Sequence, residues 1–153
     1  MKHMSHKSLV LTAVCMTGLS LTLVGCTQAS SDTAAKAVSE TVTSQFKVTH
    51  VDAIEARDLL EAKPQTVVLD IRTSKEIDKG YIEGAKFADF FEEDFAQKLT
   101  KLDRNTPYLV HCASGGRSTK ALTTLEELGF TNIMHLDGGI KGWTKADLPL
   151  SRP

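Results

Sequence analysis

Residues 107–118 read PYLVHCASGGRS, the most informative local pattern in the chain. The first five residues form a short, largely apolar run without alternation, which is typical of a strand covered on both faces. Small residues and two glycines follow, and apolar residues then recur at helical spacing from Arg117 to Leu128, where Gly129 ends the pattern. The stretch predicts a buried strand, a tight loop and a helix, with Cys112 at the carboxyl end of the strand.

The chain from Phe46 to Pro153 alternates between strand and helix patterns in the same way. Further strands are predicted at residues 66–70, 85–88 and 132–136, and helices at 51–63, 73–80, 91–101 and around Trp143. In the helix predicted at 91–101, Phe91 is expected on the buried side. This alternation favours one α/β domain, with a parallel sheet of about five strands and helices on both faces. In such sheets, sites form at the carboxyl ends of the strands.

The first 25 residues have the features of an export signal. A basic start precedes an uncharged apolar stretch from Leu9 to Leu23, which is shorter than the roughly 20 residues that span a bilayer. It ends in Leu23-Val24-Gly25-Cys26, which resembles a bacterial lipobox and implies cleavage before Cys26 and lipid attachment to its sulfur. The alternative is an ordinary signal peptide with an incidental Cys26.

The expected organisation is therefore a signal peptide at 1–25, a flexible tether at 26–45 that carries the lipidated Cys26, and a folded domain at 46–153. The tether is rich in Ser, Thr and Ala. The protein is expected outside the cytoplasm, anchored to a membrane by lipid. In a Gram-negative host this means the outer membrane or the periplasmic face.

Cysteine usage singles out one residue. Cys15 would leave with the signal and Cys26 would carry lipid, so Cys112 would have no intrachain partner. Exported proteins usually pair their cysteines as disulfides. An unpaired thiol in this setting is either buried and inert, or it takes part in a chemical reaction.

The loop after Cys112 has the composition of an anion cradle. Its small residues allow consecutive N–H groups to point inward, and the helix that follows adds its positive end. Arg117 adds a fixed cation. We expect these surroundings to lower the pKa of the Cys112 thiol from its free value of about 8.5 and so to favour the thiolate.

The ordered motifs resemble those of single-domain rhodaneses, a family of sulfurtransferases. The first signature is matched by residues 67–72 together with Glu76, Gly80, Ile82, Gly84 and Ala85, the active loop by residues 112–118, and the closing signature by Gly129, Phe130, Gly138, Gly139 and Trp143. The resemblance covers nearly all of residues 46–153.

The resemblance implies a rhodanese-like fold and two-step sulfur transfer. Cys112 would attack the sulfane sulfur of a donor such as thiosulfate or a persulfide, releasing sulfite or a thiol. The Cys112 persulfide would be held by the loop, whose members are Ala113, Ser114, Gly115, Gly116, Arg117 and Ser118. Cyanide, a thiol or the cysteine of a partner protein would then take the outer sulfur. The resemblance implies no metal and no organic cofactor.

Two features depart from the family pattern. Tyr81 stands where the first signature usually has His. Ala113 and Ser114 stand where thiosulfate-specialised members often carry basic residues, which weakens the case for thiosulfate as the natural donor.

Two other functions remain open. One is a non-catalytic module that binds a partner or carries sulfur. The other is a phosphatase or arsenate reductase, but four residues separate Cys112 from Arg117, one fewer than in a phosphatase signature. The shorter loop should leave too small a cradle for a phosphate.

Several polar residues have alternative roles. Asp70 and Arg72, at the end of a strand, either touch substrate or hold neighbouring loops, and Arg117 either contacts the anion or pairs with an acidic side chain. Ser118 is expected to cap the junction of loop and helix. His111 and His135 are expected to pack in the core or at strand ends, because no two of His111, Cys112 and His135 have the spacing of a metal-ligand pair.

The charge pattern excludes one class of partner. The formal net charge is −1, from 18 basic and 19 acidic side chains, with no long basic run. A nucleic-acid partner therefore has no electrostatic support.

Overall fold

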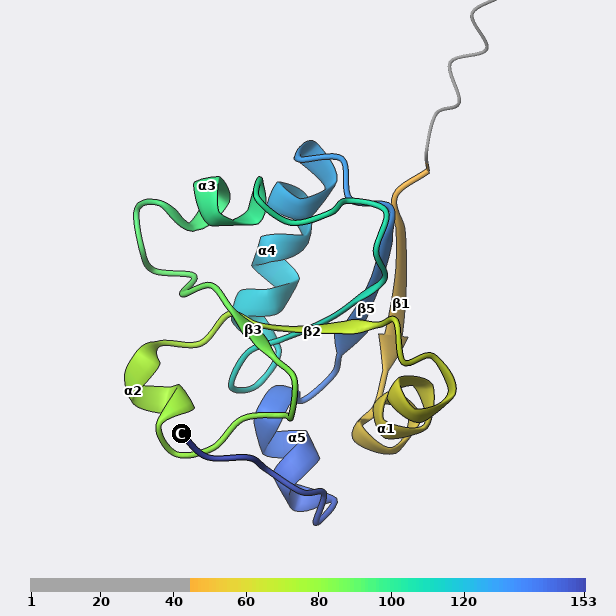
Figure 1. Ribbon diagram of the computed structural model, residues 1–153, viewed down its shortest axis with the longest axis vertical. Helices are drawn as coiled ribbons and strands as arrows, with labels where there is room; N and C mark the ends of the chain where they lie inside the picture. The colour runs from red at the N-terminus through yellow and green to blue at the C-terminus, as the bar shows by residue number, and fades with distance from the viewer. Residues whose placement is uncertain (1–44) are drawn as a thin grey trace, which may run out of the picture. The chain divides into compact units, whose positions relative to one another are not determined.

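The computed structural model describes residues 45–153. The predicted signal peptide, Cys26 and almost all of the predicted tether lie outside these residues. The described part contains a parallel sheet with the strand order β1-β5-β4-β2-β3 (Figure 1). Its strands are β1 (Lys47–Val51), β2 (Val67–Asp70), β3 (Lys86–Phe87), β4 (Tyr108–His111) and β5 (Asn132–Leu136). The predicted α/β fold class is confirmed.

Helices cover both faces of this sheet, in two groups (Figure 1). The helices are α1 (Ala53–Ala62), α2 (Ser74–Ile77), α3 (Phe95–Leu99), α4 (Gly116–Glu127) and α5 (Gly139–Lys145). Residues of α3 and α4 belong to one apolar cluster, and residues of α1 and α5 belong to another.

The central strands contribute to both apolar clusters, which explains their unbroken apolar sequence. Leu69 and Val110 pack into the cluster with α4, whereas Val68 and Leu109 pack into the cluster with α1. Each buried side chain of this size contributes about 1.5–3 kcal/mol. The strand that leads to Cys112 is thereby held on both sides.

Both predicted capping boxes are present. Asp52 accepts hydrogen bonds from the N–H groups of Ile54 and Glu55, and Glu55 accepts one from the N–H of Asp52. At α2, Glu76 Oε2 accepts hydrogen bonds from the N–H and the hydroxyl of Thr73, at 3.0 and 2.8 Å. These contacts fix where both helices begin.

Two elements differ from the prediction. Lys47–Val51 forms an edge strand, so Val51 ends β1 and does not open a helix. Most of β1 is exposed and polar, and it therefore lacks an apolar strand pattern.

The helix predicted at residues 91–101 is reduced to α3. The carboxylate of Asp89 accepts a hydrogen bond of 2.9 Å from the N–H of Phe91, and such local bonds compete with helix formation. Phe91 is 69% exposed, so its predicted burial is wrong.

The C-terminal residues pair with the segment that follows α2. Tyr81 and Ser151 exchange two backbone hydrogen bonds of 2.9 and 2.8 Å in an antiparallel bridge. The indole N–H of Trp143 donates to the carbonyl of Pro149 at 2.9 Å. These contacts hold the last residues against the domain.

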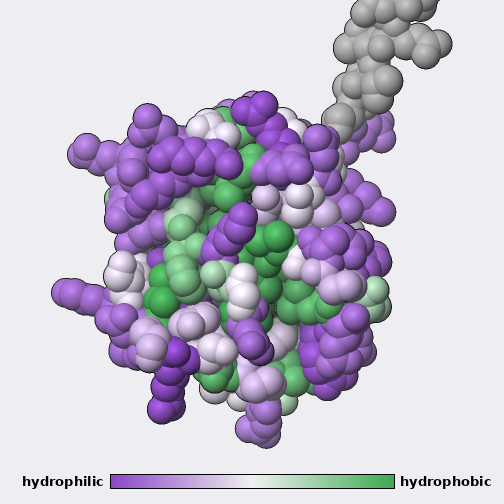
Figure 2. Space-filling view, viewed as in Figure 1, coloured by the Kyte–Doolittle hydropathy of each residue, from purple (hydrophilic) through white to green (hydrophobic). Residues whose placement is uncertain are grey.

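The surface is mostly hydrophilic, with an apolar area in the middle of the face shown in Figure 2. Phe87 and Phe91 are among the large apolar side chains that are exposed. Within residues 45–153, no helix has both the length and the hydropathy needed to cross a membrane.

Candidate active site

Cys112 lies directly after β4, and its side chain is enclosed by the loop that leads into α4. The thiol sulfur accepts a hydrogen bond from the N–H of Gly115 at 3.2 Å and lies 3.6 Å from the hydroxyl of Ser118. Gly115 adopts a φ of +99°, which favours glycine and turns its N–H inward. The residue is only 1% exposed. The thiol is thus buried, yet polar donors face it.

The opposing effects on this thiol can be separated. Burial raises the pKa of Cys112, because the thiolate loses its hydration. Hydrogen bonds from the N–H and hydroxyl of Ser118, and from the N–H groups of Ser114 and Gly115, lower it. The hydrogen bonds outweigh burial, so the pKa lies below its ordinary value, in the direction expected from the sequence.

The loop backbone is held from behind by the start of α5. The carbonyls of Cys112 and Ala113 accept hydrogen bonds from the N–H groups of Ile140 and Lys141, at 2.9 and 3.1 Å. Gly139 lies against these carbonyls with a φ of +56°, and a Cβ there would lie 2.4 Å from the Cys112 oxygen. Only glycine allows this close approach.

Arg117 forms a two-point ion pair with Glu76, which comes from α2. Its two terminal nitrogens lie 2.8 and 2.6 Å from the Glu76 oxygens, and its guanidinium lies over the ring of Phe91 at 5.4 Å. The Arg117 hydrogen bond lowers the pKa of Glu76 to about 2. Of the two roles open to Arg117, the structure shows pairing with an acidic side chain.

We expect Glu76→Gln to remove an acid-dependent part of the stability. The pKa of Glu76 is about 2 in the folded protein, against an ordinary 4.5, so its ion pair stabilises the fold fully above pH 4.5. That contribution is lost as the pH falls from 4.5 towards 2. Thermal unfolding of the two proteins should therefore differ most near neutral pH, and the difference should shrink across this window. Parallel curves down to the acid limit would contradict the assignment.

Asp70 and Arg72 form a buried ion pair at the end of β2. Arg72 Nε and Nη2 donate to Asp70 at 2.6–3.0 Å, and Nη2 also donates to the carbonyl of Gly80 at 2.9 Å. Nη1 donates to the carbonyl of Glu76 at 3.2 Å. These contacts tie the α2 segment to the sheet, and none of them includes the Cys112 sulfur.

His111 is fully buried beside this ion pair. Its Nε2 lies 3.6 Å from Asp70 Oδ2 and has no hydrogen-bond partner within residues 45–153. Burial lowers the pKa of His111, which favours the neutral ring. Its position in the core agrees with the packing role expected from the sequence.

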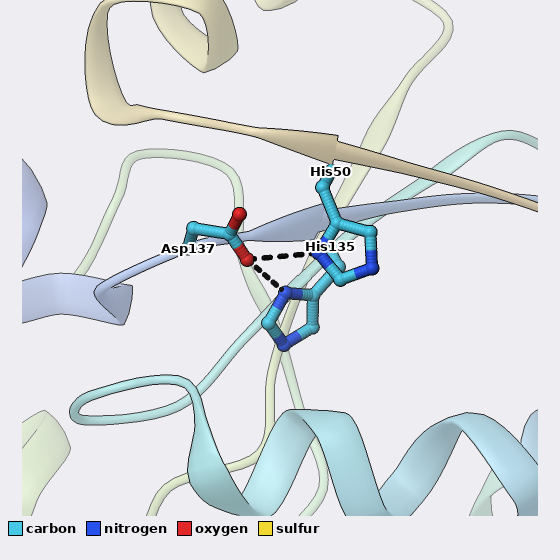
Figure 3. A group of neighbouring side chains, drawn as sticks. All are labelled: His50, His135 and Asp137. Carbon is cyan, nitrogen blue, oxygen red and sulfur yellow. Dashed lines mark hydrogen bonds and ion pairs between the residues drawn. The ribbon is translucent and has the colours of Figure 1, made fainter.

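His135 has a polar environment that the local sequence does not indicate. Its Nδ1 lies 2.8 Å from Asp137 Oδ1 and its Nε2 lies 2.9 Å from the Ser118 hydroxyl. The Ser118 hydroxyl oxygen also lies 2.9 Å from the carbonyl oxygen of Gly115. The N-cap of α4 is Gly115, without a side-chain cap, so the predicted capping role of Ser118 is wrong. His50 Nδ1 meets the same oxygen of Asp137 at 2.9 Å (Figure 3).

This grouping depends on the pairing of β1 with β5, which makes His50 the register partner of His135. The cluster could have been found from the sequence only if residues 47–51 had been recognised as a strand. The pairing explains why neither His50 nor Asp137 was singled out from the sequence.

A groove borders the reactive loop at Ala113. Its lining includes Lys79 from the turn after α2, Lys141 from α5 and Leu150 from the C-terminal segment. Two lysines from distant segments of the chain thus lie in the lining of this groove.

The parallel sheet, the cysteine loop at a strand end and the glycine pair behind it agree with a match of residues 52–146 to the rhodanese-like domain family. The chain belongs to the rhodanese-like family.

Named relatives of this chain include sulfurtransferases. It is 33% identical over 104 residues to thiosulfate sulfurtransferase GlpE of Shewanella oneidensis, covering 68% of this chain and 98% of that protein. It is 32% identical over 95 residues to the probable adenylyltransferase/sulfurtransferase MoeZ of Mycobacterium tuberculosis, covering 62% of this chain but only 24% of that longer protein.

A solved structure shares the fold. The rhodanese-like domain protein from Staphylococcus aureus matches with a TM-score of 0.60 and 27% identity, covering 69% of this chain and 98% of that one.

Proposed function

We propose that the protein is a sulfurtransferase that carries sulfur as a persulfide on Cys112. The observation that carries this proposal is the Cys112 sulfur itself, which faces the N–H of Gly115 and the hydroxyl of Ser118 at the start of α4. Membership of the rhodanese-like family and sulfurtransferases among the relatives support it.

The reaction consists of two displacements at sulfur. In the first, the Cys112 thiolate bonds to the sulfane sulfur of the donor, whose bond to that sulfur breaks, and the electron pair leaves with sulfite or a thiolate. In the second, an acceptor nucleophile bonds to the outer sulfur and the Cys112 thiolate leaves. Both steps begin or end with negative charge on sulfur, which the inward N–H groups and the positive end of α4 stabilise.

The burial of Cys112 limits how substrates reach it. A persulfide places the transferable sulfur one bond farther out than the thiol sulfur. The groove beside Ala113, with Lys79 and Lys141 in its lining, offers an approach for an anionic donor. We therefore place thiosulfate and anionic persulfides among the donors, and cyanide, small thiols and protein cysteines among the acceptors.

Replacing Lys79 and Lys141 together with alanine should raise the KM for thiosulfate about two- to thirtyfold, because two exposed charge contacts of roughly 0.2–1 kcal/mol each are removed. The KM for a persulfide donor with no net charge should change much less, since it gains less from a cation. Steady-state kinetics with both donors provide the measurement. Lys47→Ala, at the opposite end of the strands, is the matched control. Equal losses with both donors would contradict a charge-based role.

The proposed transfer is tested by the intact mass of the protein after exposure to thiosulfate or a polysulfide. We expect a gain of one sulfur atom that disappears when cyanide or a thiol is added. A stable gain that no acceptor removes would favour a sulfur-carrier module. No gain with any donor would favour a non-catalytic binding module.

The proposed location is extracytoplasmic, with a lipid anchor on Cys26. Its support is the sequence of residues 1–26, in which an apolar stretch ends at Leu23-Val24-Gly25-Cys26. Metabolic labelling with a fatty-acid analogue should mark the natural protein and not Cys26→Ser. Equal labelling of both would exclude Cys26 as the anchor.

A further inference from the structure

We infer that His135, held by Asp137, takes the proton of the Cys112 thiol through the hydroxyl of Ser118. This role rests on the proposed function, because it supplies the thiolate that attacks the donor. It makes His135 and Ser118 positioning and proton-transfer residues of the same site.

A continuous chain of contacts links the four side chains. Asp137 Oδ1 lies 2.8 Å from His135 Nδ1, and His135 Nε2 lies 2.9 Å from Ser118 Oγ. Ser118 Oγ lies 3.6 Å from the Cys112 sulfur, within hydrogen-bond range for sulfur. Figure 3 shows the outer end of this chain, where the rings of His50 and His135 both turn towards the carboxylate.

The exposure of these side chains explains why linked contacts would be needed for proton transfer. Cys112 and Ser118 are 1% and 0% exposed, so bulk water has little direct access to the thiol proton. His135 is also buried, but the side chain of Asp137 is 55% exposed. The series of hydrogen-bonded side chains therefore leads from the buried thiol of Cys112 to the partly exposed carboxylate of Asp137.

The hydrogens can be placed consistently before and after transfer. Before transfer, His135 donates its Nδ1–H to Asp137, and its Nε2 accepts the Ser118 hydroxyl, which in turn accepts the thiol hydrogen. Transfer moves the thiol proton to Ser118 while the hydroxyl proton moves to Nε2. The products are a thiolate and an imidazolium, and Ser118 then donates to the thiolate. No atom or electron is left over.

Asp137 stabilises the product of this transfer. Its carboxylate faces the imidazolium ring, as the third member of a nucleophile–base–acid arrangement does. Hydrogen bonds from His50 and then His135 lower the pKa of Asp137, so it stays ionised near neutral pH.

Other charged groups near the thiol have partners of their own. Arg117 is paired with Glu76, and Arg72 is paired with Asp70. His111, on β4, directs Nδ1 at the carbonyl of Cys112 at 3.2 Å and not at the thiol. Among residues 45–153, two histidines are buried near the loop, and of these His135 alone contacts a side chain that reaches the sulfur.

The same cluster could be considered for a metal ion, since His50, His135 and Asp137 each offer a ligand atom within 4.8 Å of the others. Both Nδ1 atoms, however, already meet Asp137 Oδ1 at hydrogen-bond distance. A metal would have to replace both contacts. The observed contacts favour the proton-transfer role.

The test is the rate of Cys112 alkylation by iodoacetamide against pH, in the full-length chain without a sulfur donor. His135→Gln and Ser118→Ala should each shift the midpoint upward by about one pH unit, so alkylation near neutral pH slows about tenfold. The plateau at high pH should stay unchanged, because the thiol then ionises without help. Ser118→Thr, which keeps the hydroxyl, should restore the natural midpoint.

The control is Lys47→Ala, an exposed change on the same strand as His50 and outside the four linked side chains; its profile should match that of the natural protein. A uniform rate loss at every pH in His135→Gln would overturn the proposal and indicate a structural role. An unchanged midpoint would overturn it too. Slowing by added Zn²⁺ that His50→Ala abolishes would assign the cluster to metal binding instead.

Alkylation and sulfur transfer can fail independently. If the intact mass shows persulfide formation but the midpoint does not move, the transferase stands and the proton route falls. If the midpoint of the alkylation profile shifts but no sulfur is gained, the proton-transfer role is supported and the sulfurtransferase proposal is contradicted.

Discussion

Replacing Cys112 with serine should abolish sulfur transfer. The loss of turnover should be on the order of 10⁴-fold or more, because a hydroxyl cannot form a persulfide and removal of a nucleophile eliminates the covalent route. Serine is close in size to cysteine and can accept the Gly115 N–H, so the loop should keep its shape. The measurements are steady-state turnover with cyanide as acceptor and the intact mass after exposure to donor.

The matched control for this experiment is Cys26→Ser, which removes a different thiol. It should retain full turnover in a detergent extract, because residue 26 lies outside the rhodanese-like match at 52–146. Sulfur gain or turnover that persisted in Cys112→Ser would show that another group carries the sulfur. Equal losses in both variants would point to a general effect on the protein.

Gly139→Ala should be the most destabilising of the glycine substitutions near the loop. The new Cβ would lie 2.4 Å from the Cys112 oxygen and 2.8 and 2.9 Å from backbone atoms of Ala113 and Ser114. Backbone atoms cannot rotate away as side chains do, and the left-handed φ adds its own cost. Together these effects should cost roughly 2–5 kcal/mol of unfolding free energy, a large part of the stability of an ordinary domain.

Substitutions at two other glycines distinguish the steric contact from the cost of the left-handed backbone conformation. Gly116 has no positive φ and no neighbour within 4 Å of an added Cβ, so Gly116→Ala should be neutral or slightly stabilising. Gly84 has a φ of +74° but open space around it, so Gly84→Ala should show the backbone cost alone, about 1–2 kcal/mol. Denaturant unfolding of all three variants measures the differences. A cost for Gly139→Ala no larger than that for Gly84→Ala would show that the contact with the loop is not as close as described.

The sequence predicts those elements whose burial or end is marked by adjacent residues. The strands β2 and β4 are buried on both faces and therefore have continuous apolar sequences, and the capping boxes at Asp52 and Thr73 mark the starts of α1 and α2. The edge strand β1 has no such pattern, since most of its residues are exposed. The helix predicted from Phe91 fails because Asp89 satisfies the local N–H in another way.

The candidate site shows the same division. The position of Cys112 and the composition of its loop follow from adjacent residues. The partner of Arg117, by contrast, is Glu76, 41 positions away. The link from Ser118 to His135 likewise depends on how α4 packs against β5, which no local pattern specifies.

The bridge between Tyr81 and Ser151 has a consequence for donor choice. It holds Leu150 in the lining of the groove beside Ala113. Gly80 lies so close to Leu150 that an added Cβ would meet it at 3.2 Å. The groove beside the Cys112 loop is therefore shaped in part by the C-terminal segment. Substitutions at Leu150 would change which molecules are admitted while the chemistry at Cys112 remained the same.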